Sequence, residues 1–148
     1  MSTEVQMTAA VIDGDDFETV RYPTDDIHLR LTQGGNVQVV EYESTDRDGP
    51  PPHYHLWHEI EYVIEGQVEF YVNGVWQSGG PGTLQMLPAG AAHSVRVPSG
   101  TARLLMITIG APYDGFARDL STLYASGEAS LEGVVATANR WGVRLEGS

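Results

Sequence analysis

The sequence predicts an all-β domain, a two-sheet sandwich or barrel of short strands followed by two short helices. Short apolar or alternating segments are separated throughout by Gly, Pro, Asn and Asp turns, which is typical of such folds. In residues 113–148 the apolar residues change to helical spacing. A chain of 148 residues is long enough for one hydrophobic core. We therefore expect a flexible N-terminal arm at 1–15, a β-barrel at 16–112 and a helical extension packed on the barrel at 113–148.

The N-terminal arm has no firm hydrophobic period and ends in the acidic turn from Asp13 to Asp16. The first strands are expected at 17–22, 26–31 and 36–42. In the second of these the alternation places Ile27, Leu29 and Leu31 inward. On the same alternation His28 faces outward, so we do not expect it to bind a metal.

Residues 50–66, PPPHYHLWHEIEYVIEG, carry the first candidate metal ligands. His53 and His55 are two residues apart, so on an extended strand both side chains leave the same face, and Glu59 follows four residues later. Imidazoles with a carboxylate suit a first-row divalent metal, whereas calcium and magnesium prefer oxygen ligands. A solvated or hydrogen-bonded His pair is the alternative that this stretch alone leaves open.

The strand expected at 59–65 has glutamates at most of its odd positions and apolar residues at its even positions. One interpretation buries Ile60, Tyr62 and Ile64 and leaves the glutamates in water. If Glu59 instead binds a metal inside the barrel, the apolar row faces outward and needs a cover, such as a helix or a second subunit. Glu61 then also faces inward, where a buried charge indicates an acid or base.

The remaining strands follow from turn signals. Asn73-Gly74 predicts a tight hairpin, and glycine or proline turns separate the later segments. We expect strands at 68–72, 75–77, 83–87, 93–97 and 101–109. The last of these is apolar on both faces and is expected to be a central strand covered on both sides.

Two helices are expected after residue 113. Apolar residues recur at helical spacing from Phe116 to Tyr124 and again from Leu131 to Trp141, with Ser130 placed to cap and Gly142 to stop the second helix. These helices are candidates for part of the cover over the outward apolar row.

A second segment, residues 82–93, supplies a further histidine. We call residues 50–66 the first arm of the candidate site and residues 82–93 its second arm. Gly82, Pro88, Gly90 and His93 follow the first arm at fixed gaps, with His93 just after a sharp turn. Together with His53, His55, Glu59 and Gly66 of the first arm, these residues resemble the two signature motifs of the cupin superfamily. Eight matching positions at the right gaps are specific, since each residue type occurs by chance at roughly one site in ten to twenty.

The resemblance covers about residues 17–110 and implies a single-domain cupin, a jelly-roll-type β-barrel that is usually a homodimer. Carried over by position, it implies that His53, His55, Glu59 and His93 bind one divalent transition metal per chain: iron, manganese, nickel, cobalt, copper or zinc. This sequence departs from the two family motifs at two positions, neither of which is one of the implied ligands. The glycine that opens the first motif lies closer to the histidine pair, at Gly49, and Val97 replaces the asparagine that ends the second motif.

Within the superfamily the chain looks most like small quercetin-dioxygenase-like bacterial proteins. That group includes oxygenases of enolic and phenolic compounds as well as cyclases and isomerases. Where it often has an aromatic residue two positions after the ligand glutamate, this chain has Glu61. The resemblance implies a metal-dependent enzyme, first a dioxygenase-type oxidoreductase on a small aromatic or enolic compound. The site itself makes Glu59 and Glu61 the candidate catalytic residues, since either could take a proton from a bound enol or phenol. A cyclase or isomerase, or a non-catalytic cupin that binds a small molecule, are the alternatives.

Composition limits the partners. A formal net charge of -12 with only 8 Lys and Arg residues argues against nucleic acid and anionic membranes and favours a small-molecule substrate. With no cysteine, the chain has neither disulfides nor thiolate ligands. No segment resembles a secretion signal or a membrane span, so we expect a cytoplasmic protein.

Several other side chains have weaker assignments. His58, Arg96 and Arg103 are expected at the surface. Candidates for pocket walls, with plain core packing as the alternative, are Trp57, Tyr71, Trp76, Met86 and Met106.

Overall fold

The structure is a computed structural model that describes residues 8–34 and 36–148. In chain order its elements are β1 (Glu18–Arg21), β2 (Asp25–Gly34), β3 (Val37–Ser44), β4 (His53–Tyr54), β5 (His58–Glu65), β6 (Val68–Val72), β7 (Val75–Gly79), β8 (Leu84–Leu87), β9 (His93–Arg96), β10 (Ala102–Ile109), α1 (Tyr113–Ala125), α2 (Leu131–Arg140) and β11 (Arg144–Leu145).

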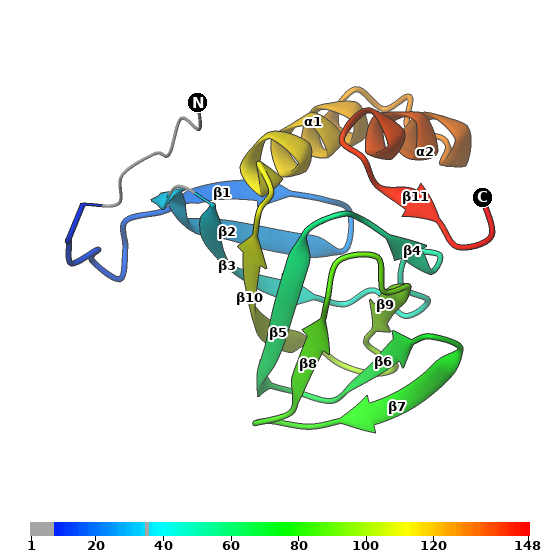
Figure 1. The fold of residues 1–148 in the computed structure, drawn as a ribbon, viewed down its shortest axis with the longest axis horizontal. Coiled ribbons are helices and arrows are strands. Elements are labelled where there is room, and N and C mark those ends of the chain that lie inside the picture. The colour runs from blue at the N-terminus through cyan, green and yellow to red at the C-terminus, as the bar shows by residue number, and fades with distance from the viewer. Residues whose placement is uncertain (1–7, 35) are drawn as a thin grey trace.

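In this described part of the chain the strands form two antiparallel sheets. One has the order β1-β2-β3-β10-β5-β8 and the other has the order β11-β4-β9-β6-β7. Figure 1 shows the two sheets wrapped around a common interior, with α1 and α2 side by side over one end. The predicted fold class, an all-β jelly-roll barrel with short C-terminal helices, is confirmed.

The inward residues of the two sheets pack against each other along part of the barrel. One hydrophobic cluster draws on β5 and β10 of the first sheet and on β6 of the second. Its buried members are Val63, Val68, Phe70, Val97, Ala102 and Leu104. Because neighbouring members come from facing sheets, this cluster holds the sandwich closed beyond the cavity described below.

The structure shows which face of β5 is buried. Glu59, Glu61 and Val63 are buried, whereas Ile60 is half-buried and Tyr62 is 41% exposed. The inward face of β5 is therefore the glutamate face, as the metal interpretation of the sequence requires.

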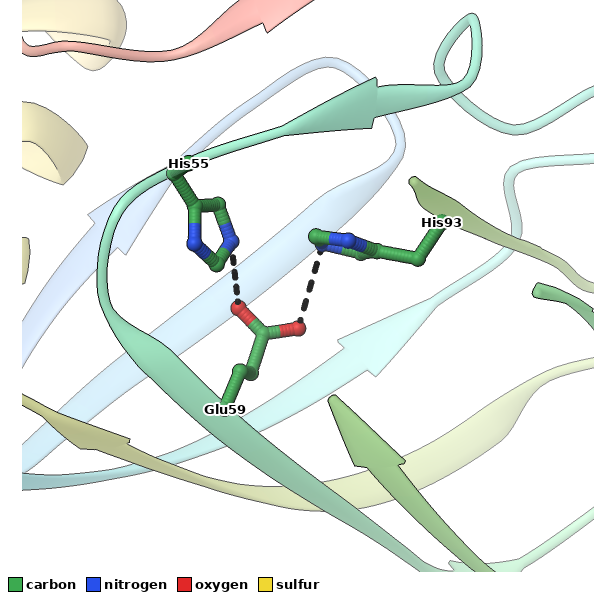
Figure 2. Close-up of side chains that lie close together, drawn as sticks. All are labelled: His55, Glu59 and His93. Atoms are coloured by element: carbon green, nitrogen blue, oxygen red, sulfur yellow. Dashed lines mark ion pairs between the residues drawn. The ribbon is translucent and has the colours of Figure 1, made fainter. Parts of the chain in front are cut away.

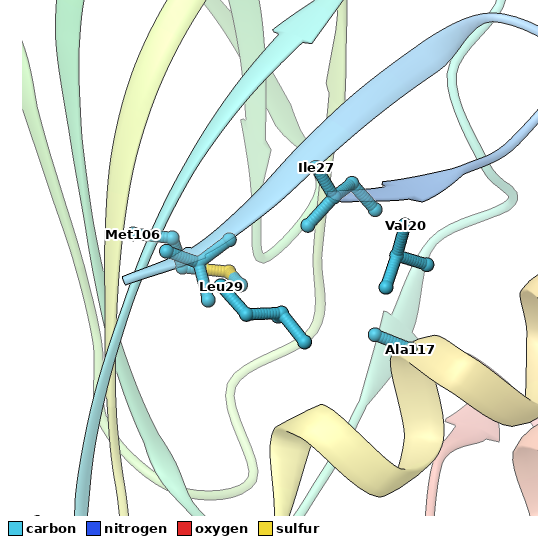
Figure 3. Packing of buried hydrophobic residues seen from close by; sticks show 6 residues of the cluster. Val20, Ile27, Leu29, Met106 and Ala117 are labelled. Atoms are coloured by element: carbon cyan, nitrogen blue, oxygen red, sulfur yellow. The ribbon is translucent and has the colours of Figure 1, made fainter. Parts of the chain in front are cut away.

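The expectation that the helices cover the outward apolar row is wrong. Ala117 of α1 packs on Val20, Ile27 and Leu29, which point to the inside of the six-stranded sheet (Figure 3). The helices have an apolar face, and the open end of the barrel offers apolar surface on the inner side of β1 and β2. The outer face of β5 and β8 is consequently left at the surface of the chain, with Leu84 58% and Met86 62% exposed.

Strand β10 lies at the centre of its sheet, between β3 and β5, as expected. Its inward residues Leu104, Met106 and Thr108 are buried. Its outward residues are only half-buried, and Ile109 is exposed. The prediction that β10 is covered on both faces is therefore wrong for its outer face in a single chain.

Turns and caps follow the sequence closely. Asn73 and Gly74 both have positive φ, 47° and 94°, which is the backbone of the predicted hairpin turn between β6 and β7. The Ser130 side chain accepts a hydrogen bond from the Gly133 amide and caps α2. Gly142, with φ 82°, follows the end of that helix.

The C-terminal segment contains a short strand, β11, that the sequence analysis did not predict. β11 pairs with β4, with Leu145 opposite His53, and brings the C-terminal segment beside the first arm. A strand of two residues has no hydrophobic period, so the sequence gives no signal for it.

Part of the expected N-terminal arm, residues 1–7, lies outside the described residues. Residues 8–15 are exposed, and the Arg30 guanidinium donates to the carbonyl oxygens of Asp13 and Asp16 at 3.1 and 2.8 Å. The division of the chain at residues 15 and 112 stays a prediction. Among the described residues, neither helix has the length and apolar character needed to cross a membrane.

Candidate metal centre

The two histidine arms meet because β4 pairs with β9. In this pairing His53 lies directly opposite His93. The carbonyl of His55 also accepts a hydrogen bond from the amide of Gly90 at 2.8 Å, which ties the end of the first arm to the turn of the second. Glu59 is the second residue of β5 and points to the same interior.

Gly49 lets the loop before β4 approach this region. Its φ is 71°, and a Cβ at this position would lie 2.4 Å from the carbonyl oxygen of Val95. Only glycine fits such a backbone and such an approach. The Ser94 hydroxyl then donates to the carbonyl of Pro50 at 2.6 Å, so the proline segment is held against β9.

His55, Glu59 and His93 form a compact buried group (Figure 2). Oε1 of Glu59 lies 3.3 Å from Nε2 of His55, and Oε2 lies 3.6 Å from Nε2 of His93. One ligand atom of each residue lies within 4.8 Å of the other two. Three of the four predicted ligands are thus brought together.

His53 is placed beside this group. Its ring centroid lies 4.4 Å from that of His93 and 6.2 Å from that of His55, and its side chain is half-buried. The structure therefore puts the fourth predicted ligand next to the group without including it in the compact set.

All three imidazoles are oriented by a hydrogen bond at the same ring nitrogen. Nδ1 lies 3.0 Å from the Pro51 carbonyl in His53, 3.1 Å from the Trp57 carbonyl in His55 and 2.9 Å from the Ala91 carbonyl in His93. A carbonyl can only accept, so Nδ1 carries the proton and Nε2 keeps a free lone pair. This backbone anchoring is the usual support of metal-binding histidines.

Burial keeps these imidazoles neutral. It lowers the pKa of His55 to about 4 and, together with the neighbouring His53, the pKa of His93 to about 3; the pKa of His53 is also lowered by burial. The short contacts to Glu59 therefore join a carboxyl group to neutral rings at neutral pH. Neutral imidazole is the form that binds a metal.

The carboxyl of Glu59 is in an unfavourable place for an isolated charge. Burial raises the pKa of Glu59 to about 7, although a hydrogen bond with Glu61 lowers it. A divalent cation at the same point would favour the ionised carboxylate. Neutral Nε2 donors and one buried carboxylate thus fit a first-row divalent metal.

Glu61 lies next to Glu59 on the inner wall. It is buried and accepts a hydrogen bond from the Tyr42 hydroxyl. Burial, and after it the charge of Glu59, raise the pKa of Glu61 well above its ordinary value. The sequence predicted the inward position of Glu61 but missed Tyr42, because the strand at 36–42 has apolar residues on both faces and its alternation does not identify the inward side.

A cavity of about 450 Å³ opens beside the group. The expected walls Trp57 and Met106 line it, and Trp57 stacks on the His55 ring with centroids 4.0 Å apart. Tyr71, Trp76 and Met86 do not line it. Tyr71 and Trp76 pack edge to face on the β6–β7 hairpin, and Met86 lies on the exposed outer face. α1 and α2 supply further apolar lining, which the sequence did not predict.

The side chains expected outside the site are outside it. His58 is exposed, and its Nδ1 accepts a hydrogen bond from the Ala89 amide at 2.9 Å. Arg96 stacks over Trp76 at 3.8 Å and pairs with Glu69, and His28 stacks on Phe17. Arg103 pairs with glutamates on the outer face of the sheet.

Sequence comparison gives one family and one relative. The Cupin domain family matches residues 30–109. A protein named Quercetin 2,3-dioxygenase from Bacillus subtilis (strain 168) is 30% identical over 91 residues, which are 61% of this chain and 27% of that protein. The similarity thus covers much less than two thirds of the relative's length.

Solved structures agree on the fold. The polyketide cyclase RemF from Streptomyces resistomycificus has a TM-score of 0.56 at 21% identity, over 69% of this chain and 80% of that one. An RmlC-like cupin from Shewanella frigidimarina NCIMB 400 has a TM-score of 0.64 at 17% identity, over 73% of this chain and 96% of that one. The family match covers more than half of the chain, so this protein is a member of the Cupin domain family.

Proposed function

We propose, starting from its membership of the cupin family, that this protein is a metal-dependent enzyme acting on a small aromatic or enolic compound. The observation that carries the proposal is the convergence of Nε2 of His55 and His93 on the two oxygens of Glu59, beside a cavity. Each imidazole is held for this by a backbone carbonyl. A protein that only enclosed a small molecule would have no need of such a donor set.

The proposed ligands of one divalent transition metal are His53, His55, Glu59 and His93. His53 belongs to the set by the orientation of its ring, which has the same Nδ1 anchoring as the other two. When bound, such a metal acts as a Lewis acid on an enol or phenol oxygen and, if it is redox-active, supports reaction with dioxygen. The imidazoles favour iron, manganese, nickel, cobalt, copper or zinc over calcium and magnesium.

The protein's own contribution to the chemistry lies in Glu61 and Tyr42. Glu61 lines the cavity next to Glu59, and the Tyr42 hydroxyl donates to its carboxyl group. A carboxyl group at this place can take a proton from a bound hydroxyl or return one to carbon or oxygen. Apolar walls, with Trp57 stacked on His55, keep bulk water away from the exchange.

The first candidate reaction is that of a dioxygenase-type oxidoreductase. It is supported by the 30% identity to the Bacillus subtilis relative over 91 residues. The predicted group of quercetin-dioxygenase-like proteins agrees with this relative.

A cyclase or isomerase is the second candidate. The buried Glu61, with its hydrogen bond from Tyr42, favours it, because proton transfer at carbon needs a positioned acid or base and no oxidant. The fold similarity to a polyketide cyclase is compatible with this alternative.

Oxygen consumption separates the two candidates. Protein reconstituted with iron, manganese, nickel or cobalt is supplied with a flavonol such as quercetin or with a cyclic enol, and oxygen uptake and product mass are followed together. Uptake of one dioxygen per product supports the oxidoreductase, and an isomeric or cyclised product without uptake supports the second candidate. Metal-loaded protein that alters none of a broad panel of enols and phenols would contradict an enzymatic role.

A further inference from the structure

The cavity has a second polar wall away from the metal centre. The turn between β1 and β2 and the end of β3 contribute Thr24, Asp25, Ser44 and Asp46 to its lining. In the sheet, β2 is separated from β5 and its Glu59 by β3 and β10. This wall therefore faces a different part of any molecule that is held at the metal centre.

Asp25 is fixed in this wall by its backbone. The Tyr22 amide donates to the Asp25 carbonyl at 2.9 Å, and the Asp25 amide donates to the Tyr22 carbonyl at 3.3 Å. On β3, Ser44 lies directly opposite Asp25. These contacts fix the backbone of Asp25 in the cavity wall.

One carboxyl oxygen of Asp25 has no partner. Oδ1 is buried, and among residues 8–34 and 36–148 no side chain or backbone group donates to it. Leaving a buried acceptor unpaired is costly, and more so for a charged group. The adjacent Asp26 is an ordinary surface acid by contrast, exposed and 3.5 Å from the guanidinium of Arg21.

The ionisable side chains around the cavity are mostly acidic. Asp25, Asp46, Glu59 and Glu61 line it, and the cation among its described lining residues is Arg144. The side chain of Arg144 donates to the Asn139 carbonyl at 2.8 Å and is exposed. An anionic substituent remote from the metal would meet carboxyl groups and no buried cation.

The field of Asp25 reaches the aromatic lining. After burial, which is the larger cause, the charge of Asp25 raises the pKa of both Tyr22 and Tyr124. Asp25 thus acts on the same space that these rings enclose.

We propose that Asp25 is a substrate-binding residue that accepts a hydrogen bond from a hydroxyl or amino group of the substrate, and that the cavity selects neutral or cationic substrates over carboxylated or phosphorylated ones. The inference rests on the proposed function, because the other end of the substrate is held at the metal centre. It adds a second anchor and a charge preference.

Three catechols test the proposal, since they share a metal-binding end and differ in remote charge: dopamine, 4-ethylcatechol and 3-(3,4-dihydroxyphenyl)propionate. Their affinities for the cobalt- or zinc-loaded protein are measured by calorimetry without oxygen. We expect the propionate to bind about tenfold more weakly than dopamine, as one charged hydrogen bond is worth about that much.

Matched variants locate the effect. Asp25→Asn is expected to lower the affinity for dopamine about tenfold and to remove most of the discrimination against the propionate. Asp26→Asn, which changes the exposed neighbour, is expected to leave all three affinities unchanged. Thermal unfolding of both variants checks that each one folds.

The outcomes separate this inference from the proposed function. Equal affinities for the three catechols, or equal effects of Asp25→Asn and Asp26→Asn, would overturn the role of Asp25 and leave the metal-dependent function standing. No binding of any catechol to protein that carries its metal would overturn both.

Discussion

Glu61 is the residue that distinguishes this site chemically, because it places a second carboxyl group beside Glu59, the proposed metal ligand. The carboxyl group is buried, with Glu59 beside it and the Tyr42 hydroxyl as its hydrogen-bond donor. A buried carboxyl group of this kind is weak as a structural device and well suited to proton transfer.

Replacing Glu61 by glutamine keeps the shape of the side chain and removes its acid–base function. We expect Glu61→Gln to lower kcat by about 10²–10³-fold while metal content is unchanged, since general acid–base catalysis contributes on that scale. Steady-state kinetics and metal analysis on the same preparation check this. Glu65→Gln, at the exposed end of the same strand, is the matched control, and full activity of Glu61→Gln would remove the residue from the mechanism.

Asp25 makes stability depend on pH. Burial raises the pKa of Asp25 from its ordinary value of 3.8, and the nearby hydroxyl groups of Ser44 and Thr24 offset only part of that rise in pKa. The folded protein therefore holds the Asp25 proton to a higher pH than the unfolded chain does, and this contribution to stability is lost as pH rises through the raised pKa.

Asp25→Asn removes that titration. We expect the free energy of unfolding of the variant, relative to the parent protein, to be more favourable at pH 7.5 than at pH 4.5. Urea unfolding at the two pH values measures it, with Asp26→Asn as the control. A difference between variant and parent that does not change with pH would mean that Asp25 titrates normally.

For single residues, the sequence analysis identified those that belong to a motif and missed those whose role depends on contacts in the folded chain. His55, Glu59 and His93 were predicted as ligands from the resemblance to the cupin motifs, and the structure brings them together. Tyr42 and Asp25 belong to no motif. Their roles depend on a contact across the barrel and on an unpaired oxygen, neither of which a sequence pattern encodes.

Among the elements, the turn between β5 and β6 is tightly constrained. Gly66 has φ 87°, and a Cβ there would lie 2.5 Å from the Thr101 carbonyl oxygen. Gly74, in the β6–β7 hairpin, has a similar φ of 94° but open space around it. The two glycines separate the cost of backbone strain from the cost of a clash.

Gly74→Ala is expected to lower the free energy of unfolding by about 1 kcal/mol, through the positive φ alone. Gly66→Ala is expected to lose about 2 kcal/mol more, because backbone atoms of β10 would have to move. Chemical unfolding of both variants provides the comparison. Equal losses would show that the contact between this turn and β10 is not rigid.

Most elements could be predicted because each has a local signal, such as the Asn73-Gly74 turn or the Ser130 cap. The sequence left open which face of β5 is buried, since both faces have a plausible partner. It also misplaced the helices, because the apolar stripe of α1 shows that the helix packs but does not show on which surface. The packing of α1 on Val20, Ile27 and Leu29 is determined by the tertiary structure and not by the helix sequence alone (Figure 3).

For the whole molecule, the outer face of the six-stranded sheet is the main unexplained surface. Tyr62, Leu84 and Met86 are exposed there on adjacent strands β5 and β8. The chain carries a net charge of -12, so two copies are expected to meet through apolar side chains such as these three and not through the charged parts of the surface. The homodimer expected from the sequence stays a prediction, and we place its contact on this face.

Light scattering coupled to size exclusion tests the dimer. We expect a mass of two chains for the parent protein and of one chain for Tyr62→Lys, because a lysine in each copy would bring like charges into an apolar contact of about 800 Å² per partner. Val75→Lys, at the exposed tip of the β6–β7 hairpin, should remain a dimer. A parent protein that runs as a monomer would leave this face without its expected partner.

Metal content, measured by mass spectrometry on freshly purified protein and again after reloading, tests the central claim most directly. We expect about one first-row divalent metal per chain in the parent protein and in His28→Ala, whose histidine lies outside the barrel, and almost none in His93→Ala. The identity of the metal would then indicate whether oxygen chemistry or proton transfer is in use. A parent protein that binds none of iron, manganese, nickel, cobalt, copper or zinc, or a His93→Ala variant that binds as much as the parent, would contradict the metal centre.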